Sequence, residues 1–315
     1  MALGAALLSS LAACKQIAGI EERKLNVDGD GGVADASTEI ENPTEEQCDE
    51  YCSLLGEGCT TETSGVLAYR ADYCKTLCLK LPKAAVATDN KAGHSFECRL
   101  DQARSASLLK GDPGEGAANC KRAGAGGDGT CGSNCEAYCQ LFKDICSETP
   151  TKPRENCLEE CSKLRDDDST DADFSFSNSI DTVQCRLTHL GAASLAAPND
   201  HCEHAAIYLD KYGPCMSATP RCEDYCAFTM NVCNDEGEED LRQYVNLQEC
   251  LNTCNKGYTT SLPPVDGQSQ DKDQDTTACR RYHVYNAMLI DKVHCNHAGP
   301  GGDGHCGPIC TNYCN

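Results

Sequence analysis

The chain has 315 residues, no tryptophan and only 5% aromatic residues, but it contains 27 cysteines. Small domains that bury too little apolar surface usually depend on covalent crosslinks. Cysteines at this density persist as disulfides only outside the reducing cytosol. The net charge of −22 repels phosphates, which excludes nucleic acid as a partner. We therefore expect an exported, disulfide-rich protein.

The N-terminal residues 1–13 have the composition of a signal peptide. The apolar run ALGAALLSSLAA is shorter than the about 20 residues that span a bilayer. It ends in Leu11-Ala12-Ala13-Cys14, which resembles the bacterial lipobox; the resemblance implies cleavage before Cys14 and lipidation of its sulfur. In that pattern Lys15 favours the outer membrane over the inner one. The alternative is a plain secreted protein in which Cys14 is part of the removed peptide.

Residues 14–43 have the composition of a flexible tether, rich in Asp, Gly, Ser and Glu in their second half. With a lipid on Cys14, this segment would hold the folded part away from a membrane. We expect a cell-envelope protein whose membrane partner is reached through the lipid and whose surface or envelope partner is unknown.

The cysteines define internal repeats. Cys48, Cys135 and Cys222 are 87 residues apart, and each opens a set of eight. We divide the chain into repeat 1 (residues 44–132), repeat 2 (133–218) and repeat 3 (219–307), followed by the start of a truncated fourth repeat (308–315). Three sets of eight, with Cys14, Cys310 and Cys314, account for all 27 cysteines.

Each repeat contains two Cys-X3-Cys segments, which place two sulfurs on one helical face, one turn apart. Two such helices packed antiparallel join the outer cysteines to each other and the inner cysteines to each other. This arrangement is similar to the twin Cys-X3-Cys hairpins of small mitochondrial chaperones. The predicted hairpin bridges are Cys48–Cys78, Cys52–Cys74, Cys135–Cys161, Cys139–Cys157, Cys222–Cys254 and Cys226–Cys250.

A third helix is expected at residues 98–109, 185–196 and 279–290, and Gly-rich turns follow at 124–132 and 299–307. By elimination, the remaining cysteines are expected to pair as Cys59–Cys98, Cys120–Cys131, Cys146–Cys185, Cys202–Cys215, Cys233–Cys279 and Cys295–Cys306. Arg99, Arg186 and Arg280 follow the sixth cysteine of each repeat, and we expect each to pair with a neighbouring acid. The fold class is thus mostly α and disulfide-rich, with tandem helical hairpins.

Two histidine pairs are candidate metal ligands. His201 and His204, and again His294 and His297, are spaced i, i+3, so that a helix could present both imidazoles to one Zn2+ or Cu2+. His189 and His283 lie 11 or 12 residues upstream, roughly 16 Å away along a continuous helix, and join only if the chain folds back. Repeat 1 has no such pair. The alternative is that these histidines merely pack beside disulfides and that the protein has no cofactor.

The strings LAAC, IAGIEERKL, CxxYC, CRxYH and HCxHAGPGGDGxCG resemble those of cysteine-rich repeat lipoproteins of Gram-negative bacteria, over nearly the whole chain. That resemblance implies no activity. The chain also lacks a C-x-x-C redox pair, a G-x-S-x-G elbow and an H-E-x-x-H motif, so we expect no enzyme. The expected function is a non-catalytic, lipid-anchored spacer, adhesion or envelope-binding protein. Metal binding by the histidine pairs is the alternative, and an exported enzyme of unfamiliar type comes third.

Overall fold

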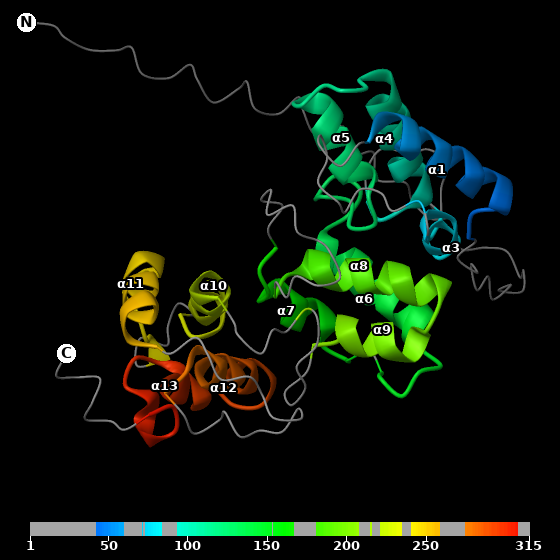
Figure 1. The fold of residues 1–315 in the computed structure, drawn as a ribbon. Coiled ribbons are helices and arrows are strands. Elements are labelled where there is room, and N and C mark those ends of the chain that lie inside the picture. Colours follow the sequence, from blue (N-terminus) through cyan, green and yellow to red (C-terminus); the bar gives the residue numbers. More distant parts are fainter. Residues whose placement is uncertain are drawn as a thin grey trace, which may run out of the picture. The chain divides into compact units, whose positions relative to one another are not determined.

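A computed structural model describes residues 42–59, 71, 73–83, 93–152, 154–166, 181–207, 215, 221–234, 241–258 and 275–307. The chain divides between Thr38 and Glu39 into two units, and all described residues belong to the second, Glu39–Asn315. The fold is mostly helical, as Figure 1 shows, and it is rich in disulfides; both features agree with the prediction from the sequence. Within the described residues the only β feature is an isolated bridge between Arg165 and Thr182.

The same helices recur in each repeat. Repeat 1 contains α1 (Glu45–Gly58), α3 (Cys74–Cys78), α4 (Phe96–Leu108) and α5 (Glu115–Ala123). Repeat 2 contains α6 (Asn134–Cys146), α7 (Cys157–Ser162), α8 (Val183–Leu195) and α9 (Pro198–Ala205). Repeat 3 contains α10 (Cys222–Val232), α11 (Leu247–Gly257), α12 (Thr277–Leu289), α13 (His294–Ala298) and a 3-10 turn, η3 (Gly302–Gly304).

Side-chain caps fix where several of these helices begin. Thr44 opens α1 through a capping box with Gln47, and Ser133 opens α6 in the same way with Glu136. The third helix of each repeat has a hydroxyl cap, in which the Ser or Thr oxygen accepts from the amide of the sixth cysteine. These caps are Ser95, Thr182 and Thr276. Because that cysteine forms a disulfide, the cap also fixes the position of the crosslink.

The first two helices of each repeat form the hairpin that the Cys-X3-Cys spacing predicts. In repeat 1 the structure joins Cys48 with Cys78 and Cys52 with Cys74. The equivalent bridges in the other repeats are Cys135–Cys161, Cys139–Cys157, Cys222–Cys254 and Cys226–Cys250.

The other predicted pairs are wrong. The bridges are Cys59–Cys120, Cys98–Cys131, Cys146–Cys202, Cys185–Cys215, Cys233–Cys295 and Cys279–Cys306, so Cys59–Cys98, Cys120–Cys131, Cys146–Cys185, Cys202–Cys215, Cys233–Cys279 and Cys295–Cys306 do not form. The reason is a fourth helix, α5, α9 or α13, that carries the seventh cysteine. This helix brings the seventh cysteine to the end of the first helix and leaves the sixth for the eighth.

Buried cysteines occupy much of the interior. Cys48, Cys98 and Cys120 are fully buried, and the remaining core consists mainly of Leu, Tyr and Ala side chains. Four crosslinks in each repeat thereby reduce the need for a large apolar core, since each disulfide typically stabilises a fold by about 2–4 kcal/mol. None of the helices in the described segments is both long and apolar enough to cross a membrane.

The buried arginines that follow the sixth cysteine of each repeat have different partners. Arg186 pairs with Asp181 at 2.9 Å, and Arg280 pairs with Asp275 at 3.0 Å, as expected. For Arg99 the expectation of a neighbouring acid is wrong, because His94 takes the sequence place of those aspartates. Arg99 instead donates to the backbone oxygens of Ser95, Gly124 and Ala125, at 3.1, 3.0 and 2.9 Å, and lies 2.9 Å from His94 Nδ1.

Candidate metal centres

Seven of the eight histidines gather in two clusters, one in repeat 2 and one in repeat 3. We call them cluster A (His189, His201 and His204) and cluster B (His283, His294, His297 and His305). The remaining histidine is His94, beside Arg99 in repeat 1.

Cluster A joins two helices. His189 lies on α8 and is 2% exposed, whereas His201 and His204 lie on α9 and are half-buried. The Nδ1 atoms of His189 and His201 are 3.1 Å apart. One nitrogen from each of the three imidazoles lies within 4.8 Å of the other two. The Nδ1 atom of His204 is buried without a hydrogen-bond partner, which leaves a lone pair available for an ion.

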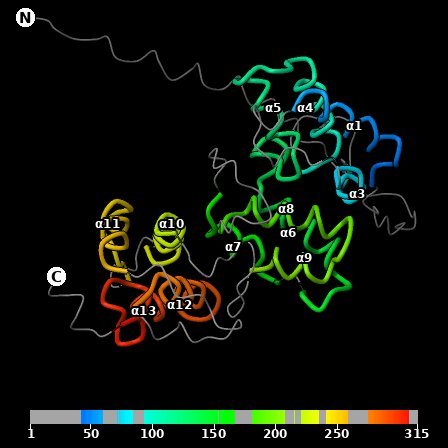
Figure 2. The backbone as a smooth tube through the Cα atoms, in the orientation of Figure 1, coloured from blue at the N-terminus to red at the C-terminus, as the bar shows by residue number. Residues whose placement is uncertain are grey.

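The chain folds back between α8 and α9 because of three adjacent residues. Ala196 ends α8 in an extended conformation, Ala197 has a positive φ of 47°, and Pro198 begins α9. Proline is well suited to the first turn of a helix. Figure 2 shows this tight connection, after which the disulfide Cys146–Cys202 holds α9 against the end of α6. Cys202 lies between His201 and His204 in the sequence, so this crosslink also orients both imidazoles.

Cluster B repeats this arrangement with different connecting residues. The Nδ1 atom of His294 on α13 lies 3.1 Å from that of His283 on α12 and 3.2 Å from that of His297. The ring centroids of His297 and His305 are 3.9 Å apart, and nitrogens of His283, His297 and His305 lie within 4.8 Å of one another. The Nε2 atom of His297 faces Asp303 at 3.7 Å, which leaves its Nδ1 atom directed at the cluster.

A tyrosine supports the histidine-bearing helix in both repeats. Tyr138 on α6 donates a hydrogen bond of 3.0 Å to the backbone oxygen of Ala205, and Tyr225 on α10 donates one of 2.6 Å to that of Ala298. Both carbonyls are at the C-terminal end of the helix and adjoin the last histidine. Tyr51 likewise donates to the backbone oxygen of Ala123, so the tyrosines of the three described CxxYC strings are buried and each satisfies a terminal carbonyl.

Burial favours the neutral form of five of the cluster histidines. It lowers the pKa of His189 to about 3, with further lowering by His204, His201 and Arg186. Burial is also the largest cause of the lowered pKa values of His201, His204, His294 and His297. Because only the neutral imidazole has a free lone pair, these lowered pKa values favour the ligating form of His189, His201, His204, His294 and His297.

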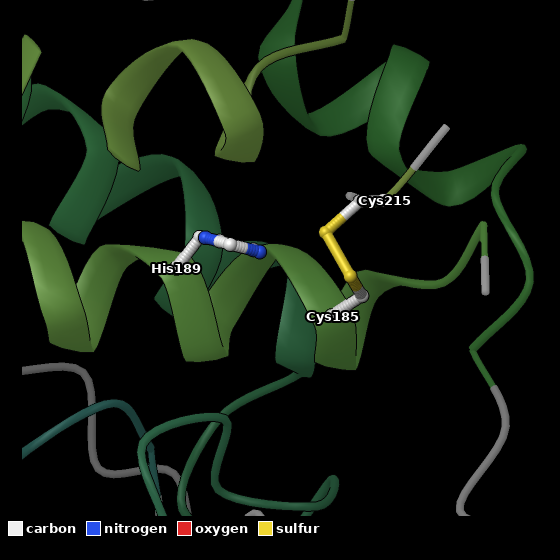
Figure 3. A group of neighbouring side chains, drawn as sticks. All are labelled: Cys185, His189 and Cys215. Atoms are coloured by element: carbon white, nitrogen blue, oxygen red, sulfur yellow. A yellow bond between two sulfur atoms is a disulfide. The ribbon is translucent and has the colours of Figure 1, made fainter. Parts of the chain in front are cut away.

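The cysteines beside each cluster are not free ligands. Figure 3 shows His189 with Cys185 and Cys215, whose sulfurs are bonded to each other. In repeat 3 the sulfurs of Cys279 and Cys306 both lie within 4.8 Å of a ring nitrogen of His283, and these two cysteines are also joined by a disulfide. Since thiolates are the strong sulfur ligands, the intact disulfides leave imidazole nitrogen as the principal donor.

The spacing of the nitrogens suits a transition metal. With metal–nitrogen distances of about 2.0–2.1 Å, a tetrahedral ion separates its ligand nitrogens by about 3.3 Å. The Nδ1 separations of 3.1 Å in cluster A and of 3.1 and 3.2 Å in cluster B are close to that value; they are also hydrogen-bond distances, so a metal would displace the proton shared by each pair. Imidazole donors favour Zn2+ and Cu2+ over Ca2+ or Mg2+.

Repeat 1 has different residues at the same three places. Gln102, Asn119 and Arg122 correspond to His189, His201 and His204. Arg122 donates to Asn119 at 3.1 Å and pairs with Glu115 at 2.6 Å. The helices of repeat 1 therefore fold with the positive charge of Arg122 in place of the last imidazole, so this repeat needs no metal ligands at these places to fold.

All four predicted ligands lie in the clusters. The structure brings His201 and His204 to His189, and His294 and His297 to His283. From the sequence, His189 and His283 join these pairs only if the chain folds back after the third helix, and the structure shows this reversal; His305 was not among the expected ligands. The sequence signal for the break was Ala-Ala-Pro at Ala196–Pro198. Cys14, Cys310 and Cys314 lie outside the described residues.

Comparison of the chain with models of protein families, with curated proteins and with solved structures finds no match.

Proposed function

We propose that this chain is a non-catalytic metal-binding protein of the cell envelope that holds Zn2+ or Cu2+ on clusters A and B. The observation that carries the proposal is the meeting of His189 with His201 and His204 across two helices. The recurrence of the same contact between His283 and His294 supports it, because chance packing gives no reason for both repeats to keep it.

The lone pairs of the cluster histidines and the negative charge of the chain both favour binding of a cation. Three imidazoles with lowered pKa values offer neutral nitrogens, and a bound ion would give the buried Nδ1 atom of His204 a partner. Two clusters in one chain would bind two ions. The net charge of −22 also raises the local concentration of cations around the protein.

Calorimetry on the oxidised full-length chain tests this function. Titration with Zn2+ and with Cu2+ should give two sites in the wild type and in His94→Gln, which alters the histidine outside the clusters. His201→Ala combined with His204→Ala should remove one site, and His294→Ala combined with His297→Ala should remove the other. Two sites that persist in both double variants would refute the proposal.

Export and anchoring are part of the same proposal. The lipobox-like residues Leu11–Cys14 support a lipid on Cys14. Inserted in the outer membrane, this lipid would keep the metal clusters at the membrane surface. Labelling cells with a tagged fatty acid should mark the wild type and leave Cys14→Ser unlabelled. Equal labelling of the two proteins would rule out this anchor.

A spacer or adhesion module is the second candidate. The recurring disulfide frame supports it, since crosslinked units resist unfolding in an extracytoplasmic environment. It predicts that a variant lacking both clusters retains its adhesion or envelope association. Loss of that association together with metal would favour a role that depends on the metal.

A further inference from the structure

We propose that His305 is the fourth ligand of cluster B, which closes that site, so that the two metal sites of the protein differ in coordination. The inference rests on the proposed metal binding and adds an asymmetry between the repeats. In cluster A three imidazoles meet, whereas in cluster B His305 meets His283 and His297, and His294 contacts the same two rings through its Nδ1 atom.

The position of His305 is fixed by its neighbours in the chain. The next residue, Cys306, is bonded to Cys279 at the start of α12, and His283 lies one turn further along the same helix. Arg280 donates a hydrogen bond of 2.8 Å to the backbone oxygen of Cys306. One disulfide and one buried hydrogen bond therefore hold the His305 ring beside the other histidines of cluster B. Its centroid lies 5.6 Å from that of His283.

Repeat 1 has the same loop without the histidine. Gly127, Asp128 and Gly129 have φ values of 86°, 48° and 73°, and the equivalent Gly302, Asp303 and Gly304 have 64°, 42° and 76°. The contact of 3.8 Å between Cys279 Sγ and the oxygen of His305 corresponds to one of 3.7 Å between Cys98 Sγ and the oxygen of Thr130. The loop thus adopts its conformation with threonine at this place, so the fold itself does not require the imidazole.

A carboxylate also favours an ion in cluster B. Asp303 lies 3.7 Å from His297 Nε2, on the side of the ring away from His294. A carboxylate that accepts a hydrogen bond from a ligating imidazole fixes the tautomer that directs the other nitrogen at the metal, and at 3.7 Å Asp303 needs to move closer to His297 to accept that bond. Asp128 occupies the same place in repeat 1, where Arg122 replaces the histidine.

The chemistry of a four-imidazole shell differs from that of a three-imidazole shell. Four protein ligands complete a tetrahedral Zn2+ ion or the equatorial plane of a tetragonal Cu2+ ion, whereas three leave one of these positions for water or another small ligand. Cluster B should therefore bind its ion more tightly than a three-histidine site and resist small monodentate anions such as azide. Removing His305 should open a coordination position.

The substitution His305→Thr tests this inference, because threonine is the residue of repeat 1. It is made in the full-length chain that carries His201→Ala and His204→Ala, so that cluster B alone is measured. We expect the affinity for Cu2+ to fall by at least about tenfold, and we expect an azide-to-copper charge-transfer band that the parent chain lacks. Thr130→Ser serves as a control in the equivalent loop and should change neither property.

The outcomes separate this inference from the proposed function. If the parent chain binds Cu2+ and His305→Thr changes neither the affinity nor the response to azide, His305 is not a ligand and the inference is overturned, while metal binding stands. If the wild-type chain binds no metal, both fall. An azide band already present in the parent chain would show an open site and would also overturn the closed shell.

Discussion

The Nδ1 atoms of His283 and His294 lie 3.1 Å apart although the two residues are on different helices. In repeat 2, His189 and His201 have the same separation. Disulfides position both partners: Cys279 lies one turn before His283, and Cys295 follows His294 directly. The crosslinks that replace a large core thus also assemble the histidine clusters.

His189, the buried histidine of cluster A, is the first residue to test. His189→Gln introduces the residue that repeat 1 has in this place, Gln102, and should reduce bound metal from two ions to one for each chain. The amide lacks the imidazole lone pair but has a similar length, so the change in metal content should not come from unfolding. Elemental analysis after dialysis measures the stoichiometry, and circular dichroism checks the fold; two ions in folded His189→Gln would exclude His189 as a ligand.

The metal-free protein should lose stability in acid through His189. Its pKa is lowered to about 3 in the folded state, mainly by burial, against about 6.5 in an unfolded chain. The unfolded state therefore binds more protons between these values, so the stabilising contribution is present above pH about 6.5 and is lost as the pH falls toward about 3. Urea unfolding at pH 7 and pH 5 should show a smaller loss in His189→Gln than in the wild type; equal losses would contradict the lowered pKa.

The disulfide that holds α9 against α6 should support both the stability of the fold and metal binding at cluster A. Cys146→Ala combined with Cys202→Ala removes the bridge that holds α9 against α6, and should reduce the free energy of unfolding by about 2–4 kcal/mol. Because His201 and His204 flank Cys202, this variant should also bind metal more weakly at cluster A than at cluster B. A variant that is destabilised yet binds both ions normally would show that the crosslink does not orient the site.

The buried ion pair of Arg186 and Asp181 should matter more than exposed pairs. Both side chains are buried and lie 2.9 Å apart, and Tyr285 donates to the same carboxylate at 2.8 Å. Asp181→Asn leaves the guanidinium charge buried and should cost about 3–5 kcal/mol. The exposed pair of Arg104 and Glu50 provides the control, since Glu50→Gln should cost less than about 1 kcal/mol. Denaturant unfolding compares the two variants, and similar costs would contradict this assignment.

Local rules predicted part of this fold. The Cys-X3-Cys spacing identified the hairpins, because two sulfurs one helical turn apart can meet only a similarly spaced pair on a facing helix. Elimination failed for the remaining cysteines because their pairing depends on where the chain reverses. Neither Cys59 nor Cys120 has a local signal for its partner, and they meet only because α5 folds back on the preceding helix.

The same reversal explains what the sequence revealed of the clusters. His201 and His204 are visible as a pair because i, i+3 spacing is a local property of one helix. His189 belongs to the same cluster through the turn at Ala197, whose positive φ no propensity indicates for alanine. His305 comes close through the disulfide of Cys306, which is a long-range contact.

X-ray absorption at the metal edge of the loaded, oxidised full-length protein tests the central claim most directly. We predict a shell of nitrogen neighbours at about 2.0–2.1 Å with the multiple scattering of imidazole for Zn2+. Sulfur neighbours at about 2.3 Å would mean that thiolates hold the metal, and a shell without imidazole scattering would mean that the histidine clusters do not. Either result would contradict the account.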